Sequence, residues 1–278
     1  ILPSELPRHF SPKIQSDVEK EVTQMLSDGV IIRSTSSCAS PVVPIKKPDG
    51  SIRLCIDYTK LNAVTVPARF PIPRIKDILQ SLKGKKYFGK IDLLKGYYQC
   101  LMNPAHTYLT AFMTSSGLYG FVRCPMGLRN AMEYFQRGMS GIFNDLLMHA
   151  CMGYVDDCLI VGNTEEQFVD NVILVLSRLS QHRLRLKLSK CTFGVSEIEF
   201  LGFMVNTAGY RMSESRISAI SIIPPPNSLT KLRSFLGMAN FFRQFIPHYT
   251  KVSHILVALT RHNAVFKWTD AHTEAFNL

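Results

Sequence analysis

The sequence lacks the features that mark membrane and secreted proteins. No apolar run approaches the roughly 18 residues that a membrane-spanning helix needs, and the N-terminus shows no basic-then-apolar signal pattern. The seven cysteines are odd in number and form no C-x-x-C pair, which argues against structural zinc and fits a reduced compartment. We therefore expect no membrane partner.

Acidic residues are scarce relative to basic ones. The 278 residues include 21 acidic and 32 basic side chains, a net charge of +11, and the basic residues are spread along the chain. Such a surplus favours a polyanionic partner. No internal repeat or low-complexity tract appears, and the chain begins at Ile1, so we expect a piece of a longer protein.

Two adjacent carboxylates interrupt an apolar, β-prone stretch. Residues 151–155 and 158–161 on either side of Asp156 and Asp157 are typical of two short strands joined at the Asp pair. Carboxylates about 4 Å apart repel by roughly 1 kcal/mol in water and about 4 kcal/mol at an effective dielectric of 20, so a cation is expected there. Oxygen ligands favour Mg²⁺, with Mn²⁺ as the alternative. An isolated pair would ordinarily be interpreted as a solvated turn.

Two other stretches invite a functional interpretation beside an ordinary one. Residues 41–58 predict a basic hairpin around the turn at 48–50, which is either a phosphate-binding flap or a solvated hairpin. Asp92 ends an apolar strand predicted over 86–92, and it is either a functional acid or a solvated strand end.

A long helix is predicted from about Ala131, and a second helix is predicted to begin at the capping box of Thr164 and Gln167.

The order of these features resembles the reverse transcriptases of long-terminal-repeat retrotransposons, most closely the Ty3/gypsy class and its retroviral relatives. The resemblance covers nearly the whole chain, because many separate motifs occur in the family's order. They are Ala39-Ser40-Pro41-Val42-Val43, Lys47-Pro48-Asp49-Gly50-Ser51-Ile52-Arg53, Asp57-Tyr58 with Lys60-Leu61-Asn62, Ile91-Asp92-Leu93, Tyr154-Val155-Asp156-Asp157, Phe200-Leu201-Gly202 and Leu232-Arg233-Ser234-Phe235-Leu236-Gly237.

The resemblance implies an α+β fold, a right-hand polymerase with an antiparallel palm sheet packed on helices. Fingers are expected at 1–66 and 100–130, the palm at 67–99 and 131–209, and the thumb at 210–261. Residues 262–278 would begin a truncated connection or ribonuclease H module. The expected partners are an RNA or DNA template with primer, dNTPs, and the ribonuclease H and integrase of a longer polyprotein, in a cytoplasmic virus-like particle or the nucleus.

The resemblance also implies the site residues. Asp92 and Asp156 would ligate two catalytic Mg²⁺ ions with the help of the Leu93 carbonyl, while Asp157 would be less directly bound. Tyr97 takes the steric-gate position, which excludes a ribose 2′-hydroxyl. The implied nucleotide contacts are Lys47, Arg53, Leu93, Tyr97 and Gly127, and the implied primer and template contacts are Gln136, Tyr154, Phe200, Leu201, Gly202, Lys231 and Arg233.

The sequence departs from the family pattern between Met126 and Met132, where a proline is lost and Arg129 adds a charge. A non-catalytic, nucleic-acid-binding descendant is therefore one alternative, although binding alone needs no cluster of repelling acids. An RNA-dependent RNA polymerase is another, against which Tyr97 and the Tyr154-x-Asp-Asp pattern argue. The preferred interpretation is an RNA-directed DNA polymerase.

Overall fold

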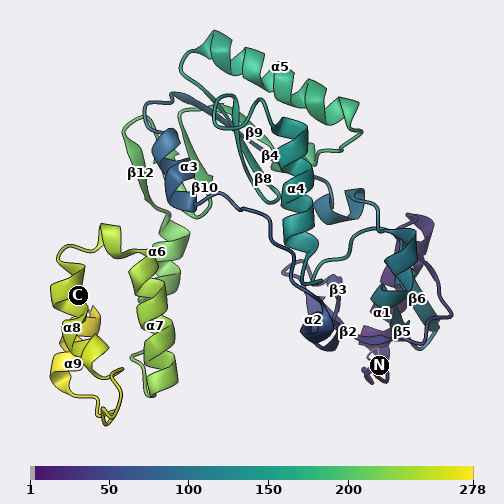
Figure 1. Cartoon of the computed structure of the whole chain (residues 1–278), viewed down its shortest axis with the longest axis horizontal. Helices are drawn as coiled ribbons and strands as arrows, with labels where there is room; N and C mark the ends of the chain where they lie inside the picture. The colour runs from purple at the N-terminus through teal and green to yellow at the C-terminus, as the bar shows by residue number, and fades with distance from the viewer. Residues whose placement is uncertain (1–3, 278) are drawn as a thin grey trace. The chain divides into compact units, whose positions relative to one another are not determined.

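The computed structural model describes residues 4–277 and divides into two compact units (Figure 1). The first unit comprises Ile1–Phe200 and Asn206–Gly209, and the second comprises Leu201–Val205 and Tyr210–Leu278. Helices and sheets alternate irregularly along the chain, which confirms the predicted α+β class. Within residues 4–277, no helix is long and apolar enough to cross a membrane.

A five-stranded sheet, in the order β1-β6-β5-β2-β3, forms one half of the first unit. Its neighbours pair antiparallel except β2 and β5, which are parallel. Helix α1 packs Val18, Val22 and Met25, which lie on one face of the helix, against this sheet. The elements are α1 (Pro12–Ser27), β1 (Ile31–Arg33), β2 (Ser40–Lys46), β3 (Ile52–Ile56), α2 (Thr59–Val64), η2 (Pro104–Thr110), β5 (Phe112–Thr114) and β6 (Gly117–Phe121).

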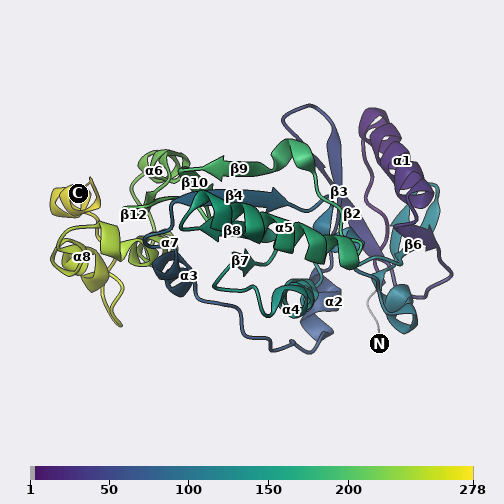
Figure 2. The same cartoon turned by 90° about the horizontal axis from the view of Figure 1, so that it is seen from above.

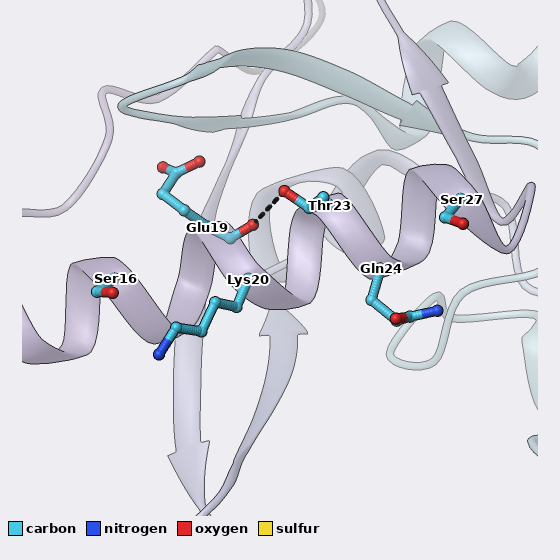
Figure 3. Close-up of a pocket in the computed structure, with 6 residues that line it drawn as sticks. All are labelled: Ser16, Glu19, Lys20, Thr23, Gln24 and Ser27. Atoms are coloured by element: carbon cyan, nitrogen blue, oxygen red, sulfur yellow. Dashed lines mark hydrogen bonds between the residues drawn. The ribbon is translucent and has the colours of Figure 1, made fainter.

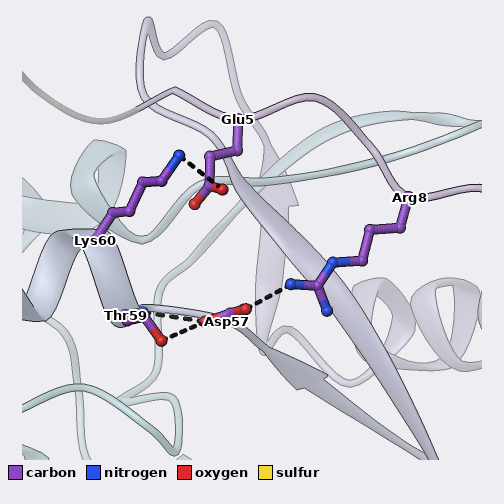
Figure 4. Close-up of polar contacts among 5 residues, drawn as sticks. All are labelled: Glu5, Arg8, Asp57, Thr59 and Lys60. Carbon is purple, nitrogen blue, oxygen red and sulfur yellow. Dashed lines mark hydrogen bonds and ion pairs between the residues drawn. The ribbon is translucent and has the colours of Figure 1, made fainter.

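Polar contacts hold the N-terminal segment to this half of the unit (Figure 4). Arg8 Nη2 lies 2.6 Å from Asp57 Oδ2, and Lys60 Nζ lies 3.0 Å from Glu5 Oε2. The Thr59 hydroxyl and backbone amide also donate to Asp57, and these hydrogen bonds, more than Arg8, lower the pKa of its carboxyl. The segment is therefore part of the folded unit.

An antiparallel four-stranded sheet, in the order β7-β8-β4-β9, forms the other half. Apolar side chains of α4 and α5 cover one of its faces, where Phe135, Met139, Phe168 and Val175 share a buried cluster with Ile91. Figure 2 shows α5 running along the strands. The elements are α3 (Ile75–Ser81), β4 (Tyr87–Asp92), η1 (Gly96–Gln99), α4 (Ala131–Phe143), β7 (Cys151–Tyr154), β8 (Asp157–Gly162), α5 (Glu165–Gln181), η3 (Leu188–Lys190), β9 (Thr192–Val195) and β10 (Glu197–Phe200).

Local sequence signals explain how α5 is held on this sheet. The Thr164 side chain accepts a hydrogen bond from the Gln167 amide, as the predicted capping box requires. Gly162 ends β8 where the backbone of Phe168 comes so near that a Cβ atom would lie 2.7 Å from it. The strand and the helix are therefore packed more closely than any larger residue at 162 allows.

The second unit is mainly helical and has its own aromatic core. The Phe203 ring lies 5.7 to 6.3 Å from the rings of Tyr210, Phe241, Phe242 and Phe245, which are separations typical of stabilising aromatic pairs. Its elements are β11 (Phe203–Asn206), β12 (Gly209–Met212), α6 (Glu214–Ser221), α7 (Leu229–Phe241), η4 (Arg243–Phe245), α8 (Tyr249–Ala258) and α9 (Asp270–Asn277).

Candidate active site

The acidic hairpin forms as predicted, with one shift of register. The turn consists of Val155 and Asp156, and Asp157 is already the first residue of β8, paired with Tyr154. The expectation that both acids form the turn is therefore wrong by one residue. Val155 has a φ of 54°, a left-handed conformation that a β-branched side chain rarely adopts. A two-residue hairpin turn needs this positive φ at its first position, where glycine is usual.

A buried amide supports the unusual backbone at Val155. Gln136 on α4 is 1% exposed, and its Oε1 accepts a 2.6 Å hydrogen bond from the Val155 backbone amide. Its Nε2 donates to Ser140 Oγ at 3.1 Å. This role was missed from the sequence, although a glutamine among the apolar residues of α4 was its signal. A contact between Gln136 and template or primer remains a prediction.

The register of β4 and β8 brings the acids of two distant segments together. Asp92 lies directly opposite Asp157, and Ile91 lies opposite Cys158. Opposed residues of antiparallel strands share a face, and successive residues alternate between faces. Because Ile91 and Cys158 are buried among the residues of α4 and α5, Asp92 and Asp157 lie on the opposite face. Asp156 projects from the adjoining turn and is exposed.

Two lysines pair with two of the three acids. Lys90 Nζ lies 2.7 Å from Asp157 Oδ1, and Lys190 Nζ lies 3.6 Å from Asp92 Oδ2. Asp156 makes no ion pair with any residue that the structure describes. These lysines offset the negative charge of the acid cluster. Neither pair was identified from the sequence, because each lysine is remote in the chain from its partner.

The chain after β4 is fixed by a segment almost one hundred residues later. Leu93 forms an isolated bridge with Leu186, and the Lys187 amide donates to the Asp92 carbonyl at 2.9 Å. Gln99 Nε2 donates to the Arg185 carbonyl at 2.9 Å, and its Oε1 accepts from the Arg185 amide at 2.7 Å. The backbone at Leu93, whose carbonyl is predicted to contact a metal ion, is therefore fixed by hydrogen bonds to residues 185–187.

The donor set suits a hard divalent cation shared with a substrate. Among residues 4–277, no three His, Cys, Asp or Glu side chains already converge in a metal-binding arrangement. Asp92 and Asp156 nevertheless offer oxygen ligands at neighbouring points, at the end of β4 and at the adjoining turn. Mg²⁺ typically uses one or two carboxylates, with water and substrate phosphates as its other ligands. The site fits that pattern.

Tyr97 is placed beside the hairpin. It follows Lys95, whose φ is 49°, and Gly96, where an added Cβ would lie 3.4 Å from the Phe135 ring. The Tyr97 ring is half-buried, with its centroid 4.9 Å from that of Phe135. Burial, together with the negative charge of Asp156, raises the pKa of Tyr97 to about 12. The ring therefore lies near the acids, and its role as a steric gate stays a prediction.

Lys47 and Arg53 lie on the hairpin of β2 and β3, which has the predicted turn. The Ser51 amide and hydroxyl donate to Asp49 at 2.9 and 2.6 Å, and these hydrogen bonds lower the pKa of its carboxyl. The Lys47 amide donates to the Ser51 carbonyl at 2.8 Å. Both basic side chains are exposed. Their contact with a triphosphate stays a prediction.

The loop that departs from the family pattern is held by Asn62. Asn62 Nδ2 donates to the Gly127 carbonyl at 2.8 Å, and Asn62 Oδ1 accepts from the Arg129 amide at 2.8 Å. Arg129 Nη1 returns a 3.0 Å hydrogen bond to the Asn62 carbonyl. Gly127 has a φ of 90°, which glycine adopts without strain. The added Arg129 charge therefore has a structural use.

The remaining predicted contacts lie at or beyond the division between the units. Phe200 ends β10, and Leu201 and Gly202 follow with φ of 53° and 79°. A side chain at Gly202 would overlap the Arg216 guanidinium, which explains the glycine. Lys231 and Arg233 lie on α7; the Arg233 side chain donates to the Thr260 carbonyl at 3.5 Å. Their contacts with primer or template stay predictions.

A hollow of about 500 Å³ along α1 contains none of these residues. Figure 3 shows its polar lining on successive turns of the helix, where Thr23 Oγ1 donates to the Glu19 carbonyl at 2.8 Å. Its lining is Ser16, Glu19, Lys20, Thr23, Gln24 and Ser27.

Comparison with known families gives one match across most of the first unit. Residues 45–205 match the family described as reverse transcriptase (RNA-dependent DNA polymerase). Among solved structures, the chain is similar to a foamy viral protease-reverse transcriptase in complex with double-stranded DNA, with a TM-score of 0.88 and 26% identity over 99% of this chain and 49% of that one. The same viral protein with an RNA/DNA hybrid gives a TM-score of 0.82 at 25% identity, over 99% of this chain and 38% of that one.

Curated relatives include polyproteins of transposons from Drosophila melanogaster. The chain is 38% identical to the retrovirus-related Pol polyprotein from transposon opus, over 91% of this chain and 26% of that protein. It is 40% identical to the polyprotein from transposon 297 and 36% identical to that from transposon gypsy. Each of these two matches covers 85% of this chain and 23% of the relative. The chain thus spans about a quarter of the length of these relatives. The predicted right-hand polymerase fold is confirmed by these likenesses.

Proposed function

Because the chain belongs to the reverse transcriptase family, we propose that it extends a primer 3′-hydroxyl with dNTPs, copying an RNA template and also DNA. One observation carries this proposal: Asp92 and Asp157 are opposed across β4 and β8, with Asp156 in the adjoining turn. A protein that only binds nucleic acid gains nothing from three neighbouring acids, whose repulsion opposes both folding and polyanion binding.

We propose that Asp92, Asp156 and the Leu93 carbonyl would hold the divalent ions that this family generally uses, and that these are Mg²⁺ ions. Such ions lower the pKa of the attacking hydroxyl and offset phosphate charge. The protein's own part is placement. Gln136 fixes the turn that presents Asp156, and the Arg185–Lys187 segment fixes the end of β4, so both ligands are preorganised.

The other site residues would bind the nucleotide and the duplex. Lys47 and Arg53 would contact the triphosphate, Arg53 as a bidentate donor and Lys47 as a point charge. Tyr97 would exclude a 2′-hydroxyl, and Gly127 would lie beneath the templating pair. Proposed contacts with primer and template are Gln136, Tyr154, Phe200, Leu201, Gly202, Lys231 and Arg233, in the fingers, palm and thumb arrangement expected from the sequence.

The names of the relatives describe Pol polyproteins and support a proposal about the wider setting of the chain. We propose that this chain acts as the polymerase part of such a polyprotein, beside ribonuclease H and integrase. All seven cysteines are free, which suits a cytoplasmic particle or the nucleus.

Primer extension on an RNA template with dNTPs and Mg²⁺ tests the proposal. Asp156→Asn is the decisive variant, because it keeps the shape of the side chain and removes the charge. We expect extension by the wild type and a loss of at least about 1000-fold in the variant, as two-metal chemistry requires the carboxylate. Asp145→Asn is the matched control, since Asp145 pairs with Arg178 outside the acidic site. Equal duplex binding without extension by the wild type would instead support a binding-only descendant.

A further inference from the structure

Lys90 occupies an unusual position for a lysine. It lies on β4, between β8 and β9, and its strand neighbours Gly89 and Ile91 are buried. Its own side chain is 30% exposed, and its ammonium lies 2.7 Å from Asp157 Oδ1. A long charged side chain on an inner strand needs a compensating partner, and here that partner is one of the three acids.

The register explains why Lys90 reaches Asp157. Lys90 is paired with Leu159 and Asp92 with Asp157, so Lys90 is the diagonal neighbour of Asp157 on the face that carries the acids. Alternate residues of a strand share a face, so Lys90 and Asp92 flank the Asp157 carboxylate along β4. Asp156, by contrast, is exposed and makes no ion pair within residues 4–277. The three acids are therefore not equivalent.

We propose that Lys90 is a positioning residue that holds the Asp157 carboxylate out of the metal ligand set, leaving Asp92 and Asp156 as the ligating pair. This inference rests on the proposed polymerase function. Lys90 lies 2.7 Å from Asp157, whereas Lys190 lies 3.6 Å from Asp92 and Asp156 has no ion pair among the described residues, so Asp157 is the most fully neutralised of the three acids and the least able to compete for the ions. Removal of the ammonium frees Asp157 to join the cluster.

This role makes metal binding and catalysis respond in opposite directions. In Lys90→Gln, the carboxylate of Asp157 loses its ammonium partner, and this should tighten the binding of Mn²⁺ alone by about three- to tenfold. The same variant should lower kcat for primer extension by about 10- to 100-fold with little change in the KM for dNTP, because the ligand geometry is disturbed. Lys90→Arg keeps the charge and should bind Mn²⁺ like the wild type.

The experiment is a double-variant cycle of Lys90→Gln and Asp157→Asn in the full chain, titrated with Mn²⁺ alone and read from the electron paramagnetic resonance signal of the free ion. Lys86→Gln is the matched control: Lys86 is exposed, lies just before β4, and its loss removes the same charge without touching an acid. We expect Lys90→Gln to tighten Mn²⁺ binding at least about threefold more in the wild-type background than beside Asp157→Asn.

Two results of the double-variant cycle would overturn the proposal. One is an equal effect of Lys90→Gln in both backgrounds, which would mean that Lys90 acts only as a general charge. The other is an effect no larger than that of Lys86→Gln. If Lys90→Gln does not fold, tightened Mn²⁺ binding by Lys90→Arg would overturn it as well. Failure of the wild type to extend a primer refutes the polymerase function separately, since the Mn²⁺ cycle needs no catalysis.

Discussion

Replacement of Gln136 by leucine tests how the acidic turn is held. The change keeps a side chain of similar length in α4 but removes the oxygen that accepts the Val155 amide at 2.6 Å. Because Gln136 is 1% exposed, water cannot replace that acceptor without opening the core. A buried amide left without a partner costs about 1–3 kcal/mol. The positive φ of Val155 would then also be less constrained.

We expect Gln136→Leu to lower the free energy of unfolding by about 1–3 kcal/mol, measured by urea denaturation. Displacement of Asp156 by about 1 Å should also lower the single-turnover extension rate by about 100-fold. Ser140→Ala is the control, because it removes the other hydrogen bond of Gln136 and leaves the acceptor in place. If the Gln136→Leu and Ser140→Ala variants have the same free energy of unfolding and the same extension rate, this account of the turn is refuted.

Three further predictions concern the residues around the acids. Tyr97→Ala should admit ribonucleotides, measured as a fall in the ratio of kcat/KM for dNTP to that for the matching rNTP; an unchanged ratio contradicts the steric-gate assignment. Tyr97 has a pKa of about 12 in the fold against 10.0 ordinarily, so between about pH 10 and 12 the unfolded chain loses a proton that the fold retains and stability falls as pH rises. Tyr97→Phe should reduce the fall in the free energy of unfolding, measured by denaturation at several pH values across this window. An unaltered slope would place the cause elsewhere, for example in Tyr98, whose pKa burial also raises to about 12. Asn62→Ala should lower the free energy of unfolding by about 1–2 kcal/mol and raise the KM for dNTP, because it removes the hydrogen bonds to Gly127 and Arg129. Wild-type values of both quantities would show that the loop keeps its conformation without Asn62.

The strands and the acids could be predicted because their signals are local. Apolar alternation with a terminal acid marks β4, and β-prone residues around Asp156 and Asp157 mark the hairpin. The predicted strand ends at Asp92, where β4 ends. The turn itself was misplaced by one residue, because a valine at positive φ contradicts the usual preference for glycine. The tertiary contact with Gln136 outweighs that preference.

The supporting contacts could not be predicted because they join segments that are distant in the sequence. Nothing near Lys90 indicates that its partner is 67 residues later, and nothing near Asn62 indicates its hydrogen bonds to the loop that contains Arg129. Such pairs depend on strand register and loop placement, which the chain specifies only as a whole. For the same reason, the contacts expected of Lys231 and Arg233 with a duplex remain predictions.

The opposed register of β4 and β8 also sets which sequence changes a copy of this element can survive. Loss of one codon within β8 would exchange its two faces, turning the Cys158 thiol toward the substrate side and an acid toward the apolar helices. A codon gained in the exposed turn between β5 and β6, at Ser115 and Ser116, lengthens that two-residue loop and need not disturb the alternation of either strand. Among degenerate copies in a genome, in-frame insertions should therefore be a sharper sign of a dead polymerase in β8 than in that turn.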